Sequence, residues 1–296
     1  MFSKILVPLD GSKLAELALP YAEELARALN SEIDLIEVCE KKDCPERHIH
    51  QLYVKKMAKL LRNRLNAVGP AATVKPIVRD GKSAAEIIDY TEKSRISLII
   101  MATHGRSGIM LWAMGSVANK ILHHIHIPIL LIRVKAGTIK GGKGEMFSKI
   151  MVPLDGSDSG ETVLPHVMEL ATGVRSEVTL FQVIAPGVHV HTIGGLDYIR
   201  FPEQQIASKK ASAKQYLEEV SKKFKGMKTT VRSELKFGDP AAEIIKFAGE
   251  TDIHLVAMSA HGHSGIGRWT FGSVTHKVLH NGSTHVLLVR VPDVKA

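Results

Sequence analysis

The sequence lacks any apolar run of the roughly 20 residues that a helix needs to cross a bilayer. Its longest apolar runs, at 98–102 and 127–132, have the length of strands. Pro8 and Asp10 interrupt the N-terminal segment before an apolar core can form, so we expect no secretory signal. The sequence therefore predicts no membrane partner.

Cysteine is almost absent, since Cys39 and Cys44 are the whole complement. Two cysteines cannot build the disulfide framework of a small secreted protein, so we expect a cytoplasmic location. Both follow a predicted strand, where small loop residues are the simpler interpretation and a redox switch is the alternative.

An arginine-rich tail and a basic stripe interleaved with aromatic residues are also missing, although the formal net charge is +9. Lysines are scattered over predicted helix faces, as at 55, 56 and 59, where solvation explains them. The sequence thus predicts no nucleic-acid partner. A basic protein does raise the local concentration of anions such as nucleotides.

What the sequence does have is an internal repeat, which is sought before any other feature. The segment FSKILVPLDGS at 2–12 returns at 147–157 with one change, and AAEII at 84–88 returns at 241–245. The loop HGRSG at 104–108 returns as HGHSG at 261–265. Two copies of this length indicate two similar domains rather than a solenoid.

The domain boundaries follow from the spacing of the copies. Phe2 and Phe147 are 145 residues apart, whereas Ala84 and Ala241 are 157 apart, which places an insertion at about 185–199. The segment 136–145 is rich in Gly and Lys and is typical of a linker. We predict a first domain at 1–135 and a second at 146–296.

Each half alternates short apolar strands with amphipathic helices. In the first half, Ser12 and Ser83 are predicted to cap helices. The predicted strands lie at 5–7, 33–38, 73–78, 98–101 and 129–134, and the helices at 12–30, 52–68, 83–88 and 117–123. This alternation predicts an α/β fold with a parallel sheet covered on both faces.

Open parallel sheets bind ligands beyond the carboxyl ends of their strands, where the strand order reverses. One loop there carries Pro8 and Asp10, repeated as Pro153 and Asp155. A second loop is rich in glycine, a residue that permits positive φ and close backbone approach. Its glycines are Gly105, Gly108 and Gly115, repeated as Gly262, Gly265 and Gly272.

The second loop ends at Gly115-Ser116, or Gly272-Ser273, where a helix is predicted to begin. Unpaired N–H groups at a helix N-terminus favour phosphate. The simpler alternative is that these glycines only turn a loop and cap a helix. A P-loop motif is absent from the sequence.

Together, the segments VPLDGS and AAEII in both halves, and THGRSG and GSVA in the first with HGHSG and Gly272-Ser273-Val274 in the second, make both halves resemble universal stress protein domains in tandem. The resemblance covers nearly the whole chain. It implies two five-stranded parallel sheets of order 3-2-1-4-5, adenine nucleotide alpha hydrolase-like and Rossmann-like. It also implies that the fifth strands pair edge to edge as an intramolecular pseudo-dimer, with homodimerisation an open question.

The resemblance implies ATP binding with one departure from the family pattern. ATP-binding members share Gly, two residues, Gly, nine residues, then Gly-Ser or Gly-Thr. Ala102 and Ser259 replace the first glycine of that pattern. A Cβ there weakens the expectation without abolishing it.

The implied site places the aspartates beside the adenosine and Val38 and Val183 against the adenine. Arg106 and His263 lie where they could reach phosphates. Mg²⁺ would accompany ATP, held mostly by phosphates and waters because no carboxylate pair is evident for it. The implied nucleotide-binding residues are Pro8, Asp10, Val38, Ala102, His104, Gly105, Arg106, Gly108, Gly115, Ser116 and Val117 in the first half, and Pro153, Asp155, Val183, Ser259, His261, Gly262, His263, Gly265, Gly272, Ser273 and Val274 in the second.

Histidine is abundant, with 15 residues, and occurs in His-x-His pairs at 48/50, 124/126, 189/191 and 261/263. Zinc needs three or four ligands. We therefore read these pairs as surface or loop residues and predict no metal site.

The expected function is that of a cytoplasmic stress-response protein regulated by bound ATP. The alternatives are a slow ATPase or autokinase, and a scaffold that holds no nucleotide. For an enzyme, the nearby candidate bases are His104, His261 and His263. No catalytic residue is assigned.

Overall fold

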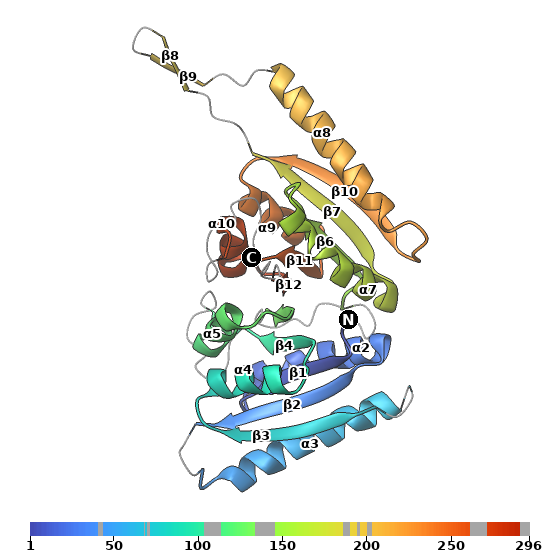
Figure 1. The fold of residues 1–296 in the computed structure, drawn as a ribbon, viewed down its shortest axis with the longest axis vertical. Coiled ribbons are helices and arrows are strands. Elements are labelled where there is room, and N and C mark those ends of the chain that lie inside the picture. Colours follow the sequence, from blue (N-terminus) through green and yellow to red (C-terminus); the bar gives the residue numbers. More distant parts are fainter. Residues whose placement is uncertain are drawn as a thin grey trace.

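The computed structural model describes residues 1–40, 44–67, 69, 72–103, 114–133, 146–185, 190–193, 196–199, 203–260 and 271–290. Within these residues the chain forms one ten-stranded sheet and a separate two-stranded hairpin. Figure 1 shows the two halves of the chain meeting at the middle of the molecule. The predicted linker at 136–145 lies outside the described residues.

The first half follows the predicted alternation of strands and helices. Its apolar strands are buried because helices cover both faces of the sheet. In chain order its elements are β1 (Lys4–Leu9), α1 (Lys13–Glu16), α2 (Ala18–Leu29), β2 (Glu32–Cys39), α3 (Arg47–Asn66), β3 (Val74–Asp80), α4 (Ser83–Lys93), β4 (Leu98–Ala102), α5 (Ser116–His124) and β5 (Ile129–Ile132).

The second half repeats this order and adds a hairpin. The hairpin, β8 and β9, lies in the segment predicted as an insertion and projects from the body of the molecule (Figure 1). In chain order the elements are β6 (Lys149–Pro153), α6 (Asp158–Glu161), α7 (Leu164–Val174), β7 (Glu177–Ile184), β8 (Val190–Ile193), β9 (Leu196–Ile199), α8 (Glu203–Lys222), β10 (Thr230–Phe237), α9 (Pro240–Glu250), β11 (Leu255–Ser259), α10 (Ser273–Asn281) and β12 (His285–Val289).

The order of the strands confirms the expected fold. The sheet runs β3-β2-β1-β4-β5 through the first half, and β10-β7-β6-β11-β12 through the second, with parallel pairing inside each half. Strand order reverses between β1 and β4 and between β6 and β11. The two places where an open sheet can bind a ligand therefore lie beyond the carboxyl ends of these strands.

The two sheets join through their fifth strands. β5 pairs antiparallel with β12, with Leu130 opposite Leu287 and Ile129 opposite Leu288. Each strand would otherwise expose an unpaired apolar edge. Buried residues from both halves also share each of the two core clusters, one on either face of the sheet.

Some predicted details at helix starts need correction. The Ser12 Oγ accepts a hydrogen bond from the Ala15 N–H, as expected of a cap. Ser83 is not a cap, because Lys82 occupies that position and the Ser83 Oγ instead donates to Glu40 Oε1 at 2.7 Å. The reach of Glu40 from the end of β2 could not be read from the sequence.

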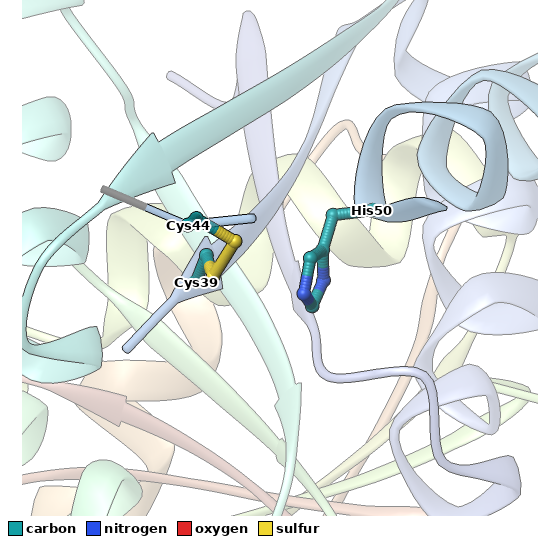
Figure 2. A group of neighbouring side chains, drawn as sticks. All are labelled: Cys39, Cys44 and His50. Carbon is teal, nitrogen blue, oxygen red and sulfur yellow. A yellow bond between two sulfur atoms is a disulfide. The ribbon is translucent and has the colours of Figure 1, made fainter. Parts of the chain in front are cut away.

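The cysteines also differ from expectation. Cys39, at the end of β2, forms a disulfide with Cys44 (Figure 2), and their Cα atoms are 6.2 Å apart. Both side chains are buried. The interpretation of both as small loop residues is therefore wrong, since Cys39 is the last residue of β2 and its sulfur is bonded to that of Cys44.

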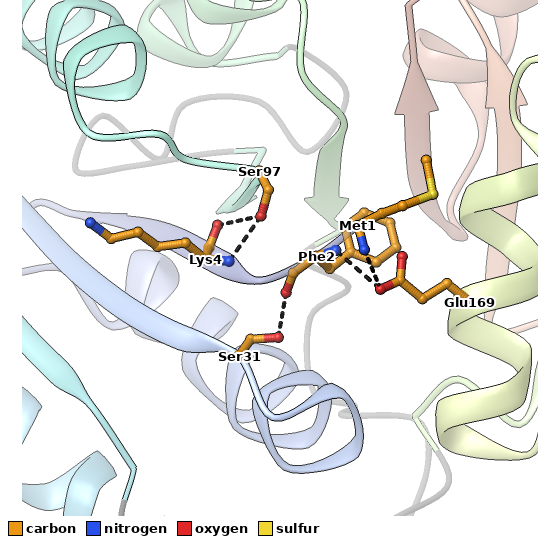
Figure 3. Close-up of polar contacts among 6 residues, drawn as sticks. All are labelled: Met1, Phe2, Lys4, Ser31, Ser97 and Glu169. Atoms are coloured by element: carbon orange, nitrogen blue, oxygen red, sulfur yellow. Dashed lines mark hydrogen bonds and ion pairs between the residues drawn. The ribbon is translucent and has the colours of Figure 1, made fainter.

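Polar contacts at the base of the sheet cross from one half to the other (Figure 3). The Phe2 N–H donates to Glu169 Oε1 of α7 at 3.2 Å, and the Met1 ammonium group lies 2.6 Å from the same oxygen. The Ser31 Oγ donates to the Phe2 carbonyl at 2.5 Å. The start of β1 is thus attached to both halves.

A second set of contacts lies beside the β5–β12 pair. The Arg133 N–H donates to His285 Nδ1 at 3.0 Å, which leaves Nε2 as the protonated nitrogen facing the Tyr21 hydroxyl 2.8 Å away. The Arg133 guanidinium donates to the carbonyls of Val278 and Leu279. One arginine of the first half therefore binds the C-terminal turn of α10.

In the part of the chain that the structure describes, no helix is long and apolar enough to span a membrane.

Candidate functional site

A cavity of about 610 Å³ lies at the carboxyl ends of β1, β2 and β4. This volume is within the range of roughly 300–1,000 Å³ that small-molecule sites occupy. Seven of the residues predicted for the first half line it: Pro8, Asp10, Val38, Ala102, Gly115, Ser116 and Val117.

The first loop is a tight turn that holds its aspartate at the cavity. Gly11 has φ 80°, a conformation that glycine adopts at little cost. The Asp10 Oδ1 accepts a hydrogen bond from the Ser12 N–H at 2.9 Å. Asp10 therefore has the turn role that its residue type suggests, and its side chain also lines the cavity.

The second loop is closed at its base. The Gly115 N–H donates to the Thr103 carbonyl at 2.8 Å, which brings the start of α5 beside the end of β4. Gly115 has φ −58° and Gly272 has φ −56°, so neither uses the positive φ that glycine permits.

The N-terminus of α5 opens onto the cavity. The N-cap of this helix is Gly115, which has no side chain with which to cap it, and Ser116 and Val117 of its first turn both line the cavity. The N–H groups of a first helical turn and the helix dipole favour an anion at this position. The geometry is therefore suited to a phosphate group.

Several predicted site residues lie outside the described residues, in the central parts of the two glycine-rich loops. These are His104, Gly105, Arg106, Gly108, His261, Gly262, His263 and Gly265.

The second half has a cavity at the corresponding place, but it measures only about 290 Å³. Phe181 lines it and stands where the first half carries Ile36; its ring centroid lies 4.8 Å from that of Phe247. The larger side chain of Phe181 therefore takes up part of this space. The predicted residues that line it are Pro153, Asp155, Val183, Ser259, Gly272, Ser273 and Val274.

The turn in the second half repeats that of the first. Gly156 has φ 82°, and the Asp155 Oδ1 accepts hydrogen bonds from the Ser157 N–H at 3.1 Å and from the Ser157 Oγ at 2.6 Å. The two halves thus have the same turn, but the cavities beside it differ in volume.

The sequence did not predict four polar residues that line the first cavity. Glu40, Glu46, His50 and Ser83 all line it. The His50 Nδ1 lies 2.8 Å from Glu37 Oε1, a carboxylate oxygen on β2. The sequence places Cys39, Cys44 and His50 close together along the chain, but which of these side chains meet depends on how the chain folds.

A tyrosine beside this wall is held in its neutral form. Burial, together with the charge of Glu16, raises the pKa of Tyr53 well above its ordinary value. The Tyr53 hydroxyl donates to Glu16 Oε1 at 3.2 Å. Tyr53 therefore acts as a hydrogen-bond donor at neutral pH.

In the part of the chain that the structure describes, the two histidines of the pair at 48/50 do not face the same side. His48 and His50 lie on α3 rather than on a strand, so a spacing of two turns them to different faces, with His48 exposed. The His124 ring bonds the Lys120 carbonyl one turn earlier in α5. The side chains of 189/191 and 261/263 lie outside the described part.

Comparison with known families gives a match over both halves. The profile of the Universal stress protein family matches residues 1–133 and 146–290. A universal stress protein of Synechocystis sp. is 24% identical over 313 residues, covering 97% of this chain and 99% of the relative. Another, from Methanocaldococcus jannaschii, is 28% identical over 156 residues, covering 52% of this chain and 88% of the relative.

A solved structure agrees with the fold. The crystal structure of a universal stress protein from Archaeoglobus fulgidus superposes with a TM-score of 0.70, covering 98% of this chain and 99% of that chain at 17% identity. At this identity the likeness concerns the fold and not the ligand.

Proposed function

The chain belongs to the universal stress protein family, and from this premise we propose that its first half binds one adenine nucleotide, ATP in particular. The observation that carries the proposal is the cavity of about 610 Å³ between the Asp10 turn and the N-terminus of α5. Bound nucleotide would regulate the conformation of the protein or its contacts in the stress response.

The chemistry of the cavity wall suits the two ends of a nucleotide. Val38, Ile87 and Met101 supply apolar surface on which a flat base can pack. Ser116 and the first turn of α5 supply donors for phosphate oxygens. Asp10 offers a carboxylate to ribose hydroxyls.

Magnesium would enter with the phosphates. The described part of the cavity wall has carboxylates at Asp10, Glu40 and Glu46. Mg²⁺ commonly keeps several waters and takes the rest of its ligands from substrate phosphates. We assign none of these carboxylates to it.

The second half is the poorer site for a nucleotide. Its cavity is less than half as large, and Phe181 lines it where the first half has a smaller apolar residue. Ser83, a hydroxyl on the wall of the first cavity, is replaced by Pro240. We therefore expect one bound nucleotide per chain.

Calorimetric titration with ATP and Mg²⁺ tests the proposal. Gly115→Val places a branched side chain at the start of α5, and we expect affinity to fall at least about tenfold, or 1.4 kcal/mol. Gly272→Val makes the matched change in the second half and should leave affinity unchanged. Equal affinity in all three proteins, each with wild-type thermal stability, would contradict the proposal.

An enzymatic role is the second candidate. Incubation with labelled ATP would release phosphate if the chain is a slow ATPase, and would label the protein if it is an autokinase. Stable binding with neither product is the outcome we expect of a regulator.

A further inference from the structure

We propose that Cys39, Cys44 and His50 form a binding site for zinc or a similar divalent cation, which becomes available when the disulfide is reduced. The two sulfurs and a ring nitrogen of His50 all lie within 4.8 Å of one another. Figure 2 shows the imidazole of α3 extending beside the disulfide at the end of β2. This site goes beyond the nucleotide function and departs from our expectation of no metal site.

The donor set selects the class of metal. Two thiolates and one imidazole favour zinc over magnesium or calcium, which prefer oxygen. Four residues separate Cys39 from Cys44, a spacing found among zinc ligands. Zinc bonds of about 2.3 Å to sulfur and about 2.0 Å to nitrogen need donors roughly 3–4 Å apart. The present positions therefore require only a small adjustment.

Burial sets these ligands apart from a chance surface cluster. Cys39 is 3% exposed and Cys44 is 7% exposed, and the His50 side chain is 15% exposed. β2 fixes the first ligand, while the first turn of α3 fixes the third. A site held by two regular elements loses little conformational entropy when the metal binds.

Glu37 positions the histidine. Its carboxylate Oε1 lies 2.8 Å from His50 Nδ1, and its side chain is almost fully buried. Because a carboxylate accepts the Nδ1 proton, the lone pair of His50 is on Nε2, the nitrogen left for a metal. A carboxylate bonded to the second nitrogen is the usual support of a histidine that binds zinc.

The redox step is a thiol–disulfide exchange. A dithiol reductant breaks the Sγ–Sγ bond through a mixed disulfide, giving two cysteine thiols as the reductant becomes a disulfide. The cation then displaces the two thiol protons and binds both thiolates and His50. Oxidation by a disulfide reverses the exchange and releases the cation.

The site belongs to the first half alone. In the second half the repeat places Gln182 at the position of Glu37 and Ile184 at the position of Cys39. Cys39 and His50 also line the first cavity, so a bound cation would lie on the wall of the proposed nucleotide site.

The test titrates the full chain with zinc against a chromogenic chelator, without nucleotide. The chain is first reduced with a phosphine, which takes up oxygen from water as two thiols form, and the phosphine is removed anaerobically. We expect one zinc per reduced chain and none per oxidised chain. With water as the fourth ligand, cobalt(II) as a probe should show thiolate-to-metal charge transfer and the strong bands of a tetrahedral ion.

Zinc binding by variants distinguishes the residues that bind the metal from those that only lie near it. Cys44→Ser and His50→Gln should each weaken zinc binding more than about 100-fold, whereas Glu37→Gln should weaken it about 10- to 100-fold with the cobalt spectrum retained. His48→Gln, two residues away and exposed, is the matched control and should bind as the wild type does.

Failure of the reduced chain to bind zinc, or a cobalt spectrum without thiolate bands, would overturn the proposal. So would equal binding by the oxidised chain or by His50→Gln. Circular dichroism of each variant establishes that it is folded, and Glu37→Gln keeps both cysteines if Cys44→Ser does not fold. Because no nucleotide is present, loss of ATP binding would not change the result.

Discussion

Asp34 is fully buried on β2, and its carboxylate has two partners in the first half. Lys4 Nζ lies 2.9 Å from Asp34 Oδ2, and the Tyr90 hydroxyl donates to the same oxygen at 2.8 Å. Burial, followed by this hydrogen bond, raises the pKa of Tyr90 to about 12. The second half has Thr179 and Phe247 at the matching positions, so it has neither the buried carboxylate nor the tyrosine hydroxyl.

Asp34→Thr copies the second half at one position and removes the carboxylate that Lys4 and Tyr90 share, while Lys4 Nζ keeps its bond to the Ser94 carbonyl. We expect it to lower the free energy of unfolding by about 3 kcal/mol, because removing one partner of a buried ion pair leaves the other uncompensated. Tyr90→Phe loses only one neutral donor and should cost about 1 kcal/mol. Urea unfolding measures both, and an equal cost would contradict the assignment.

His166 makes stability depend on pH. Burial lowers its pKa, although the Thr162 carbonyl and Glu169 oppose this and the N-terminal ammonium group adds to it. The unfolded chain therefore takes up this proton at a higher pH than the folded chain. Stability should be greatest above a pH of about 6.5, the ordinary histidine value, and fall as the pH drops below it.

His166→Tyr removes the titrating group and carries the residue that the first half has at this position, Tyr21. We expect the loss of unfolding free energy between pH 8 and pH 5 to be smaller in this variant than in the wild type. His48→Gln alters an exposed histidine and should leave the slope unchanged. Parallel curves for the wild type and His166→Tyr would show that His166 does not contribute.

Among the elements, α10 connects the second cavity with the contact between the halves. Its first turn lines the cavity, and its last turn binds the Arg133 guanidinium. A cation at the C-terminus of a helix is favourable because the helix dipole is negative there. Burial lowers the pKa of Arg133 to about 10, which still leaves it charged at neutral pH.

Arg133→Met keeps much of the aliphatic length and removes the charge. We expect the free energy of unfolding to fall by about 2 kcal/mol, since a partly buried cation and its hydrogen bonds to carbonyls are lost. Lys210→Met, on the exposed face of α8, removes a charge that caps no helix and should be nearly neutral. Equal thermal stability of both variants would contradict the role of Arg133.

The elements were the most predictable part of this protein. Buried parallel strands are continuous apolar runs, so the segments of β1 and β4 stand out in the sequence. Their order came from the family resemblance and not from periodicity. The start of α3 was missed by five residues, because its first turn lacks an apolar stripe.

The site was only partly predictable, since its chemistry depends on residues distant in sequence. Asp10 and Gly115 were found because each lies in a repeated motif. The disulfide, the Glu37–His50 contact and the smaller size of the second cavity depend on how β2 and β7 meet the residues packed against them. No local pattern reports such contacts.

At the scale of the whole molecule, the two halves share one sheet and both cores. β5 and β12 pair within the ten-stranded sheet, and each core cluster contains buried residues of both halves. The repeat in the sequence indicates two similar domains. The contacts between them lead us to expect that neither half is stable without the other.

Calorimetry of thermal unfolding tests whether the two halves unfold together. We expect a single cooperative transition, because unfolding either half would expose the apolar edge and core of the other. ATP bound in the first half should then move the whole transition to higher temperature. Two separate transitions, of which ATP moves only the first, would show that the halves unfold independently.

The most direct test of the central claim is the number of nucleotides bound per chain. Native mass spectrometry of the full chain with excess ATP and Mg²⁺ counts them without assuming an affinity. We expect one nucleotide per chain, because the cavity of the second half, which Phe181 lines, is less than half as large as that of the first. Two nucleotides per chain, or none, would contradict it.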